Sequence, residues 1–117
     1  MTWNELTELQ KKLKAFAQER DWEQFHSPKN LVMALSVEAS ELLEHFQWLT
    51  EQQSSTLDTD KKQEVAYEMA DIFIYLLRLA SELDVDLEKS VYEKIKINAE
   101  KYPVHKVKGS AKKYTEY

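Results

Sequence analysis

The chain contains no cysteine, one glycine and two prolines in 117 residues. Without cysteine it can form no disulfide, no thiolate metal site and no thiol nucleophile. The scarcity of glycine and proline argues against a sheet protein that needs many tight turns. No apolar run is long enough for a membrane span, and the N-terminus lacks the apolar centre of a signal peptide. We therefore expect a cytoplasmic protein with no membrane partner.

Basic residues are fewer than acidic ones: the chain has 16 Lys and Arg and 21 Asp and Glu, which gives a net charge of −5. Such a chain presents no broad basic surface, so we expect no nucleic-acid polymer as a partner. An anionic ligand would need a local basic cluster or a metal ion. What is abundant is typical of a folded helical protein: 43% hydrophobic and 32% charged residues. The length predicts a single domain over residues 1–117.

Apolar residues at helical spacing predict four long helices. The helices run from about Trp3 to Asp21, from Pro28 to about Thr50, from about Lys61 to Leu83 and from about Leu87 to Tyr102. Ser27, then Thr59 or Asp60, then Asp86 are the expected N-caps. After Pro103 the tail has no apolar periodicity. The predicted fold class is all-α, an antiparallel four-helix bundle with an irregular C-terminal arm.

Carboxylates interrupt the apolar faces of the second and third predicted helices. Glu38 lies inside the apolar stripe of the second helix, with Glu41 on its flank. Glu68 lies at the edge of the stripe of the third helix, with Asp71 further round in the same direction. The stripe residues are Leu31, Leu35, Leu42, Phe46 and Leu49, then Val65, Met69, Ile72, Leu76, Leu79 and Leu83.

Four carboxylates at such a seam would repel one another and lose hydration. Few basic residues interleave to neutralise them, whereas a divalent cation would offset both costs. Ligation by oxygen alone favours Mg²⁺, Mn²⁺ or Ca²⁺ over zinc. Either motif alone is common on solvated helix faces, but two of them beside apolar stripes favour a metal site. Glu44 and Glu64 extend the acidic rows and are interpreted as surface residues. Neither motif contains the histidine of E-x-x-H, which di-iron bundle proteins use.

These residues and the sequence around them resemble the MazG-like all-α nucleoside triphosphate pyrophosphohydrolases, specifically their dCTP pyrophosphatase-like branch. The family pattern of E-x-x-E, a spacer and E-x-x-D falls here on Glu38, Glu41, Glu68 and Asp71. More specific are ERDWEQFHSPKNL (19–31), EHFQW (44–48), VDLEKSVYEKIKINAEKYPVH (85–105) and GSAKKYTEY (109–117). One departure is Ser40, where relatives often have glycine. It lies on the helix face opposite the apolar stripe.

The resemblance implies hydrolysis of a (d)NTP, dCTP or 5-modified dCTP in particular, to the monophosphate and pyrophosphate. Water would attack the α-phosphorus, in a role such as cleansing the nucleotide pool. Mg²⁺, with Mn²⁺ as a substitute, would be held by the four carboxylates, and Glu38 or Glu41 would also help to deprotonate the water. A homo-oligomer is implied as well, either a dimer or a tetramer built from dimers. Apolar residues beyond one stripe per helix also favour it, among them Trp3, Leu31, Val32, Ile74 and Leu77.

Three further groups of residues are candidates for binding the nucleotide. Lys94, Asn98 and Tyr102 lie at i, i+4 and i+8 on the fourth predicted helix. By the resemblance this row binds phosphate oxygens and sugar. Trp22 and Trp48 are candidates for stacking on the base, and His26 either contacts the nucleotide or has a structural role. The lysines of the tail would either fold over the phosphates or remain solvated. They are Lys106, Lys108, Lys112 and Lys113.

Two other functions stay open at this point. A non-enzymatic metal-binding or oligomerisation protein would use the acids to hold a structural cation. It would explain the carboxylates, but neither the aromatic residues nor the Lys94–Asn98–Tyr102 row. A hydrolase of another phosphate ester would use the same metal chemistry on a different substrate.

Overall fold

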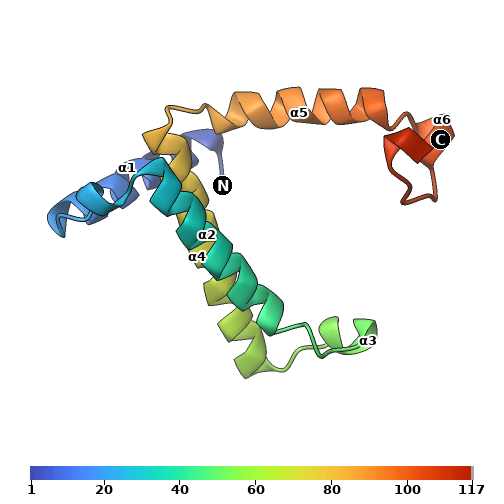
Figure 1. Cartoon of the computed structure of the whole chain (residues 1–117), viewed down its shortest axis with the longest axis horizontal. Helices are drawn as coiled ribbons and strands as arrows, with labels where there is room; N and C mark the ends of the chain where they lie inside the picture. The colour runs from blue at the N-terminus through green and yellow to red at the C-terminus, as the bar shows by residue number, and fades with distance from the viewer. Residues whose placement is uncertain (117) are drawn as a thin grey trace. The chain divides into compact units, whose positions relative to one another are not determined.

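The structure, a computed structural model, describes residues 1–116. The elements are α1 (Trp3–Glu19), η1 (Glu23–Phe25), α2 (Pro28–Glu44), α3 (Glu51–Ser54), α4 (Thr59–Glu82), α5 (Leu87–Lys101), α6 (Val104–Val107) and η2 (Tyr114–Glu116) (Figure 1). Residues 1–116 contain no strand, which confirms the all-α class. The chain forms two compact units, Met1–Asp84 and Val85–Tyr117. Its organisation as a single domain stays a prediction.

The first unit is built on α2 and α4, which run antiparallel and side by side (Figure 1). Helix α1 packs on α4. The side chain of Gln10 ties these two helices together, because its Nε2 donates to Ser81 Oγ at 3.2 Å and to the Leu77 carbonyl at 3.4 Å. Each long helix begins at a residue whose side chain accepts a backbone N–H, as N-caps do. These caps are Thr2, Ser27, Asp58 and Asp86. For α4 the cap is thus Asp58, not Thr59 or Asp60 as predicted.

The core of this unit is small. The buried residues are Leu6, Ala17, Leu31, Val65, Leu77, Arg78 and Ala80. Leu31 and Leu77 are 1% and 0% exposed, so their assignment to a surface between subunits was wrong. The predicted stripe of α4 was also partly wrong, because Met69 and Leu83 are 58% and 53% exposed. Helix α4 packs against α1 as well as α2, and this turns Leu77 and Ala80 inward in their place.

Helix α2 ends at Glu44, six residues before the predicted end at Thr50. Thr50 instead caps the short helix α3, in which Thr50 Oγ1 accepts the N–H of Gln53 while Gln53 Oε1 accepts the N–H of Thr50. This capping box requires an extended backbone at Thr50, at φ −73° and ψ 165°, which a continuous helix could not provide. Residues 45–49 therefore form turns, and the helical register assumed for Trp48 does not hold.

The second unit consists of α5 and the C-terminal arm. Pro103 follows α5 as predicted, and it serves as the N-cap of α6. The arm is more ordered than predicted, since it contains α6 and η2. Its Tyr114 ring packs edge-on against Tyr102, with ring centroids 6.1 Å apart, and Lys101 Nζ lies 4.9 Å from the Tyr114 centroid. These contacts hold the end of the arm against the end of α5. Among residues 1–116 no helix combines the length and apolar character that a membrane span requires.

Candidate functional site

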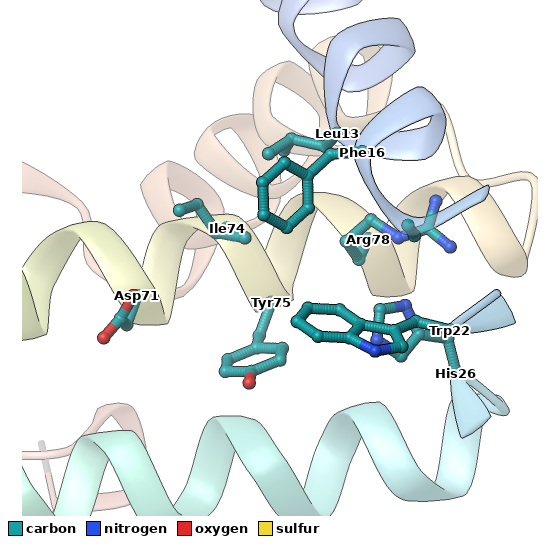
Figure 2. Close-up of a pocket in the computed structure, with 9 residues that line it drawn as sticks. Leu13, Phe16, Trp22, His26, Asp71, Ile74, Tyr75 and Arg78 are labelled. Atoms are coloured by element: carbon teal, nitrogen blue, oxygen red, sulfur yellow. The ribbon is translucent and has the colours of Figure 1, made fainter. Parts of the chain in front are cut away.

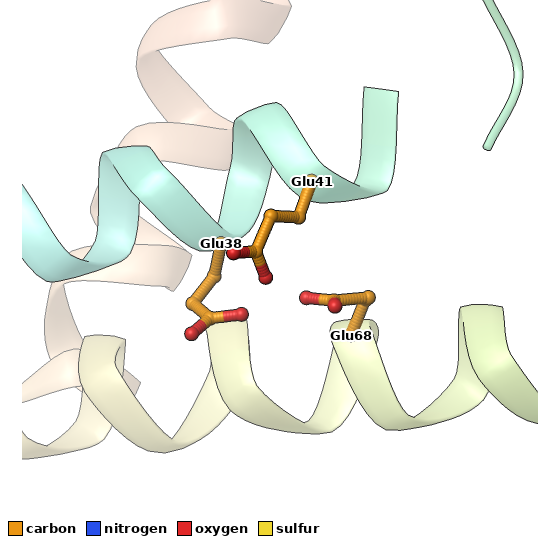
Figure 3. Close-up of side chains that lie close together, drawn as sticks. All are labelled: Glu38, Glu41 and Glu68. Atoms are coloured by element: carbon orange, nitrogen blue, oxygen red, sulfur yellow. The ribbon is translucent and has the colours of Figure 1, made fainter. Parts of the chain in front are cut away.

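Three of the four predicted metal-binding carboxylates converge between α2 and α4. Glu38 and Glu41 project from α2 one turn apart, and Glu68 faces them from α4 (Figure 3). One carboxylate oxygen from each residue lies within 4.8 Å of the other two. All three side chains are half-buried. The antiparallel packing of two helices that each carry acids one turn apart is what brings the three together.

Close packing of like charges changes the acidity of Glu38. Hydrogen bonding with Glu68 raises the pKa of Glu38, and burial raises it further. Hydrogen bonding and charge repulsion from Glu41 add to these effects, so the pKa of Glu38 reaches about 8. Without a cation the three carboxyl groups therefore hold a proton at neutral pH. Two carboxylates that share a site behave in this way because both cannot keep their charge at so short a distance.

The donor set fits a hard divalent cation. Glu68 Oε2 is buried and has no hydrogen-bond partner among the described residues. An oxygen in this situation costs about 1–3 kcal/mol unless a ligand or a cation satisfies it. Carboxylate oxygens are the ligands that Mg²⁺, Mn²⁺ and Ca²⁺ prefer. The geometry thus explains why Glu38 interrupts an apolar face.

Asp71, the fourth predicted ligand, lies apart from this trio. It is exposed, and it is not among the carboxylates that approach one another within 4.8 Å. Its position one turn after Glu68 places it beside Tyr75 instead. Burial raises the pKa of Tyr75, and the charges of Glu38 and Asp71 raise it further. Tyr75, which lines the neighbouring cavity, is therefore close enough to both acids for their charges to act on it.

The segment after α1 positions Trp22 and His26. Asp21 adopts a left-handed conformation at φ 55°, and the N–H of Trp22 donates to the carbonyl of Ala17 at 2.9 Å. With the bond from the Asp21 N–H to the Gln18 carbonyl, this is a Schellman ending, which turns the chain sharply back. The turn brings the Trp22 ring edge-on to Phe16, with centroids 5.8 Å apart, and 6.5 Å from the ring of His26.

These rings form part of a cavity of about 270 Å³ between α1, the η1 segment and α4 (Figure 2). Its lining residues are Leu13, Phe16, Ala17, Trp22, His26, Asp71, Ile74, Tyr75 and Arg78. The walls are mainly apolar and aromatic, while polar groups lie at two places. Asp71, one turn after Glu68, lies at one end of the cavity, and Arg78 and His26 lie near Trp22 at the other (Figure 2). Few polar groups in an apolar concavity are typical of a small-molecule site.

The remaining predicted site residues lie elsewhere. Trp48 is 86% exposed in the turns after α2 and does not line the cavity. Lys94, Asn98 and Tyr102 share one face of α5 in the second unit, where Lys94 and Asn98 are exposed and Tyr102 is half-buried. The structure of the first unit therefore combines Trp22 and His26 with the acids, and the roles of Trp48 and of the α5 row stay predictions.

Two cavity residues were missed as site residues by the sequence analysis. Tyr75 lies four positions after Asp71 and seven after Glu68, so the same helical periodicity that found the acids could have found it. Arg78 interrupts the apolar sequence IYLLRLA, and a basic residue in such a run is a signal of its own. Its near-complete burial depends on α1 and could not be read from the sequence.

The sequence of the chain matches a family model that is described as the MazG-like family, over residues 33–117. The match extends over α2, α4 and α5, and therefore over every carboxylate of the cluster.

This chain belongs to the MazG-like family.

Curated relatives place it near one member of that family. The chain is 46% identical to rat and 45% identical to human dCTP pyrophosphatase 1 over 103 residues, or 86% of its own length. It spans 61% of the length of each of these relatives. Among solved structures, a pyrophosphatase from Archaeoglobus fulgidus has a TM-score of 0.71 and 36% identity, with 85% of this chain and 93% of that chain covered. The predicted resemblance to MazG-like proteins is confirmed.

Proposed function

We propose that this MazG-like chain is a Mg²⁺-dependent nucleoside triphosphate pyrophosphohydrolase that cleaves dCTP or a 5-modified dCTP. Its products would be the nucleoside monophosphate and pyrophosphate. The main support is one juxtaposition: a three-carboxylate cluster adjoins an aromatic cavity, and Tyr75 is electrostatically coupled to the acids on that side. The relatives named as dCTP pyrophosphatase 1 favour a cytosine nucleotide.

Glu38, Glu41 and Glu68, with Asp71 nearby on α4, are the residues that would hold the cation. Mg²⁺ bound there would neutralise phosphate charge and polarise the α-phosphorus. The carboxylate of Glu41 or Glu38 would orient a water molecule and accept its proton. The oxygen of that water bonds to the α-phosphorus while the bond from this phosphorus to the α–β bridging oxygen breaks. The electron pair of that bond leaves with pyrophosphate.

The aromatic cavity is the proposed place for the base. Trp22 and Phe16 offer flat rings at its wall, and Tyr75 lies between the cavity and the acids. A base stacked among these rings would place its sugar and triphosphate toward Asp71 and the acidic cluster. The row Lys94, Asn98 and Tyr102 on α5 is proposed to bind phosphate oxygens and sugar, since it offers a cation, an amide and a phenol on one face.

A panel of nucleotides tests the proposed function directly. With Mg²⁺ and dCTP, dUTP, dTTP, dATP or dGTP, we expect the chain to release pyrophosphate, most rapidly from dCTP. In ¹⁸O-labelled water the label should appear in the monophosphate, because the attack is at the α-phosphorus. Release of inorganic phosphate, or label in pyrophosphate, would contradict that position of attack. A chain that is inactive on every nucleotide would favour a metal-binding or oligomerisation protein, or a hydrolase of another phosphate ester.

The apolar surface of α2 and α4 supports a homo-oligomer, which we also propose. Large apolar side chains of these helices remain exposed in the single chain, namely Val32, Met33, Val37, Leu43, Tyr67, Met69 and Phe73. A surface of this kind is more extensive than the scattered apolar residues of a monomer. Light scattering at micromolar concentration should give a mass of two or four times 13.8 kDa. A mass of one chain would contradict the proposal.

A further inference from the structure

Three nitrogen atoms at the cavity have no hydrogen-bond partner among the described residues although they are buried. They are Nδ1 of His26 and Nε and Nη1 of Arg78. The Arg78 side chain is only 3% exposed, and its Nη2 donates to Glu82 Oε1 at 2.8 Å. Each orphaned polar atom costs about 1–3 kcal/mol, and a buried guanidinium carries a charge in addition. Stability alone therefore does not explain an arginine here.

At this corner of the cavity the guanidinium of Arg78 is paired with Glu82, and its charge acts on His26. Burial lowers the pKa of His26, and the charge of Arg78 lowers it further, against smaller opposing effects of Glu82 and Glu23. His26 is therefore neutral at neutral pH, while Arg78 is always charged. Guanidinium groups donate hydrogen bonds and accept none. The corner of the cavity at Arg78 thus suits a ligand edge that carries acceptors.

We infer that Arg78 is a specificity-determining residue of the base cavity and selects a pyrimidine whose N3 and O2 both accept hydrogen bonds. The inference rests on the proposed nucleotide hydrolysis. Cytosine meets the requirement, because its N3 and O2 both accept. Uracil and thymine carry a hydrogen on N3, so their N3–H would face an N–H of Arg78. Two donors cannot pair, and both N–H groups would lack an acceptor. A site built to hydrogen-bond one edge rejects an edge that cannot pair far more strongly than an apolar pocket rejects a change of shape.

Access to Arg78 requires a small rearrangement of the cavity wall, because Nε and Nη1 are covered by protein. Phe16 and Trp22 are the wall residues suited to move, since they are 47% and 44% exposed. Arg20 packs on this part of the wall, since its guanidinium lies 3.5 Å from the Phe16 ring centroid. A base that stacks on these rings and shifts them would reach the Arg78 donors, so the correct base itself would complete the site.

The test compares discrimination between substrates in wild type, R78M and E82Q. R78M replaces the guanidinium by an unbranched apolar side chain, whereas E82Q removes the charge that pairs with Arg78 and leaves the donors in place. The measured quantity is the ratio of kcat/KM for dCTP to kcat/KM for dUTP. We expect R78M to lower this ratio by about tenfold or more, and E82Q to keep it within about threefold of wild type.

Several results would overturn the inference while leaving the proposed function in place. The first is a wild type that does not prefer dCTP to dUTP. The second is an R78M variant in which kcat/KM falls equally for both nucleotides, as loss of a phosphate contact would cause. The third is an E82Q variant whose ratio falls as far as that of R78M. If R78M does not fold, wild type alone decides with 3-deaza-dCTP, in which C–H replaces the N3 acceptor. We expect kcat/KM for 3-deaza-dCTP to be lower than that for dCTP by at least about tenfold. Equal values would overturn the inference. A wild type that releases pyrophosphate from no nucleotide refutes the proposed function itself.

Discussion

Glu41→Gln should release pyrophosphate from dCTP about 10³-fold more slowly than wild type, with the fold intact. Glutamine keeps the size of the side chain and removes both the charge and the proton acceptor. General-base catalysis contributes about 10²–10⁴-fold to a rate, and loss of a metal-holding carboxylate adds to that. Because Glu41 lies within 4.8 Å of Glu38 and Glu68 in the cluster, its replacement also removes repulsion, so the thermal midpoint should not fall.

Glu44→Gln is the matched control for this measurement. Glu44 is on the same helix, one turn after Glu41, and is exposed outside the cluster. It should keep wild-type kcat and the wild-type dependence on Mg²⁺. A titration with Mg²⁺ then separates the two roles of Glu41: if its variant recovers at high Mg²⁺ it mainly holds the cation, and if it stays slow at saturation it also moves the proton. Near-normal turnover at ordinary Mg²⁺ would remove Glu41 from the reaction.

The acidic trio could be predicted from sequence because it depends on local geometry. Residues three apart project from neighbouring positions on any α-helix, and two helices joined by a short connection pack antiparallel. Glu38 and Glu41 are therefore neighbours on α2 alone, and the position of Glu68 at the edge of the apolar stripe of α4 predicts that it faces them. Asp71 is different, since its approach to the trio depends on the rotation of α4 about its axis. Contacts with α1 and α2 together set that rotation, and no pattern within α4 encodes it.

The errors in the sequence analysis have similar causes. The prediction placed Trp48 on a helix that continued to Thr50, whereas the Thr50–Gln53 capping box begins a new helix there. The sequence signature of this capping box, a threonine followed three residues later by glutamine, is present in TEQQ. Arg78 was not identified as a site residue, because burial of a side chain by another helix is a tertiary property. The order of the C-terminal arm likewise depends on the contact of the Tyr114 ring with Tyr102. Because the tail has no apolar periodicity, no sequence pattern predicts this contact.

The metal-free protein should lose stability as the pH rises from 4.5 to about 8. The pKa of Glu38 is about 8 in the folded chain and 4.5 in its ordinary state, so over this range the folded state binds a proton that the unfolded state has lost. The free energy of unfolding falls with pH wherever the folded state binds more protons. The stabilising effect is present below 4.5 and is lost by about pH 8.

Glu38→Gln isolates this effect, because glutamine resembles the protonated carboxyl and does not titrate. His26 acts in the opposite direction, since its lowered pKa makes the folded state gain stability as the pH rises toward 6.5. That contribution is common to both proteins and cancels in their difference. Urea unfolding is measured in EDTA at one protein concentration. The free energy of unfolding of the Glu38→Gln variant, relative to that of wild type, should rise steadily from pH 4.5 to about 8. Parallel pH curves would show that the three carboxyl groups do not share a proton.

Added Mg²⁺ should reverse the order of these two proteins. A cation bound to the folded chain alone stabilises it by mass action, about 2.7 kcal/mol at a hundred times its Kd. Wild type at pH 8 offers the full charge of the cluster and should recover its stability, whereas Glu38→Gln offers one carboxylate fewer and should gain less. The proton held by Glu38 must leave when the cation binds, so the Mg²⁺ affinity of wild type should rise with pH over the interval in which metal-free stability falls. The same three carboxylates thus destabilise the empty fold at neutral pH and make it a binding site for a divalent cation.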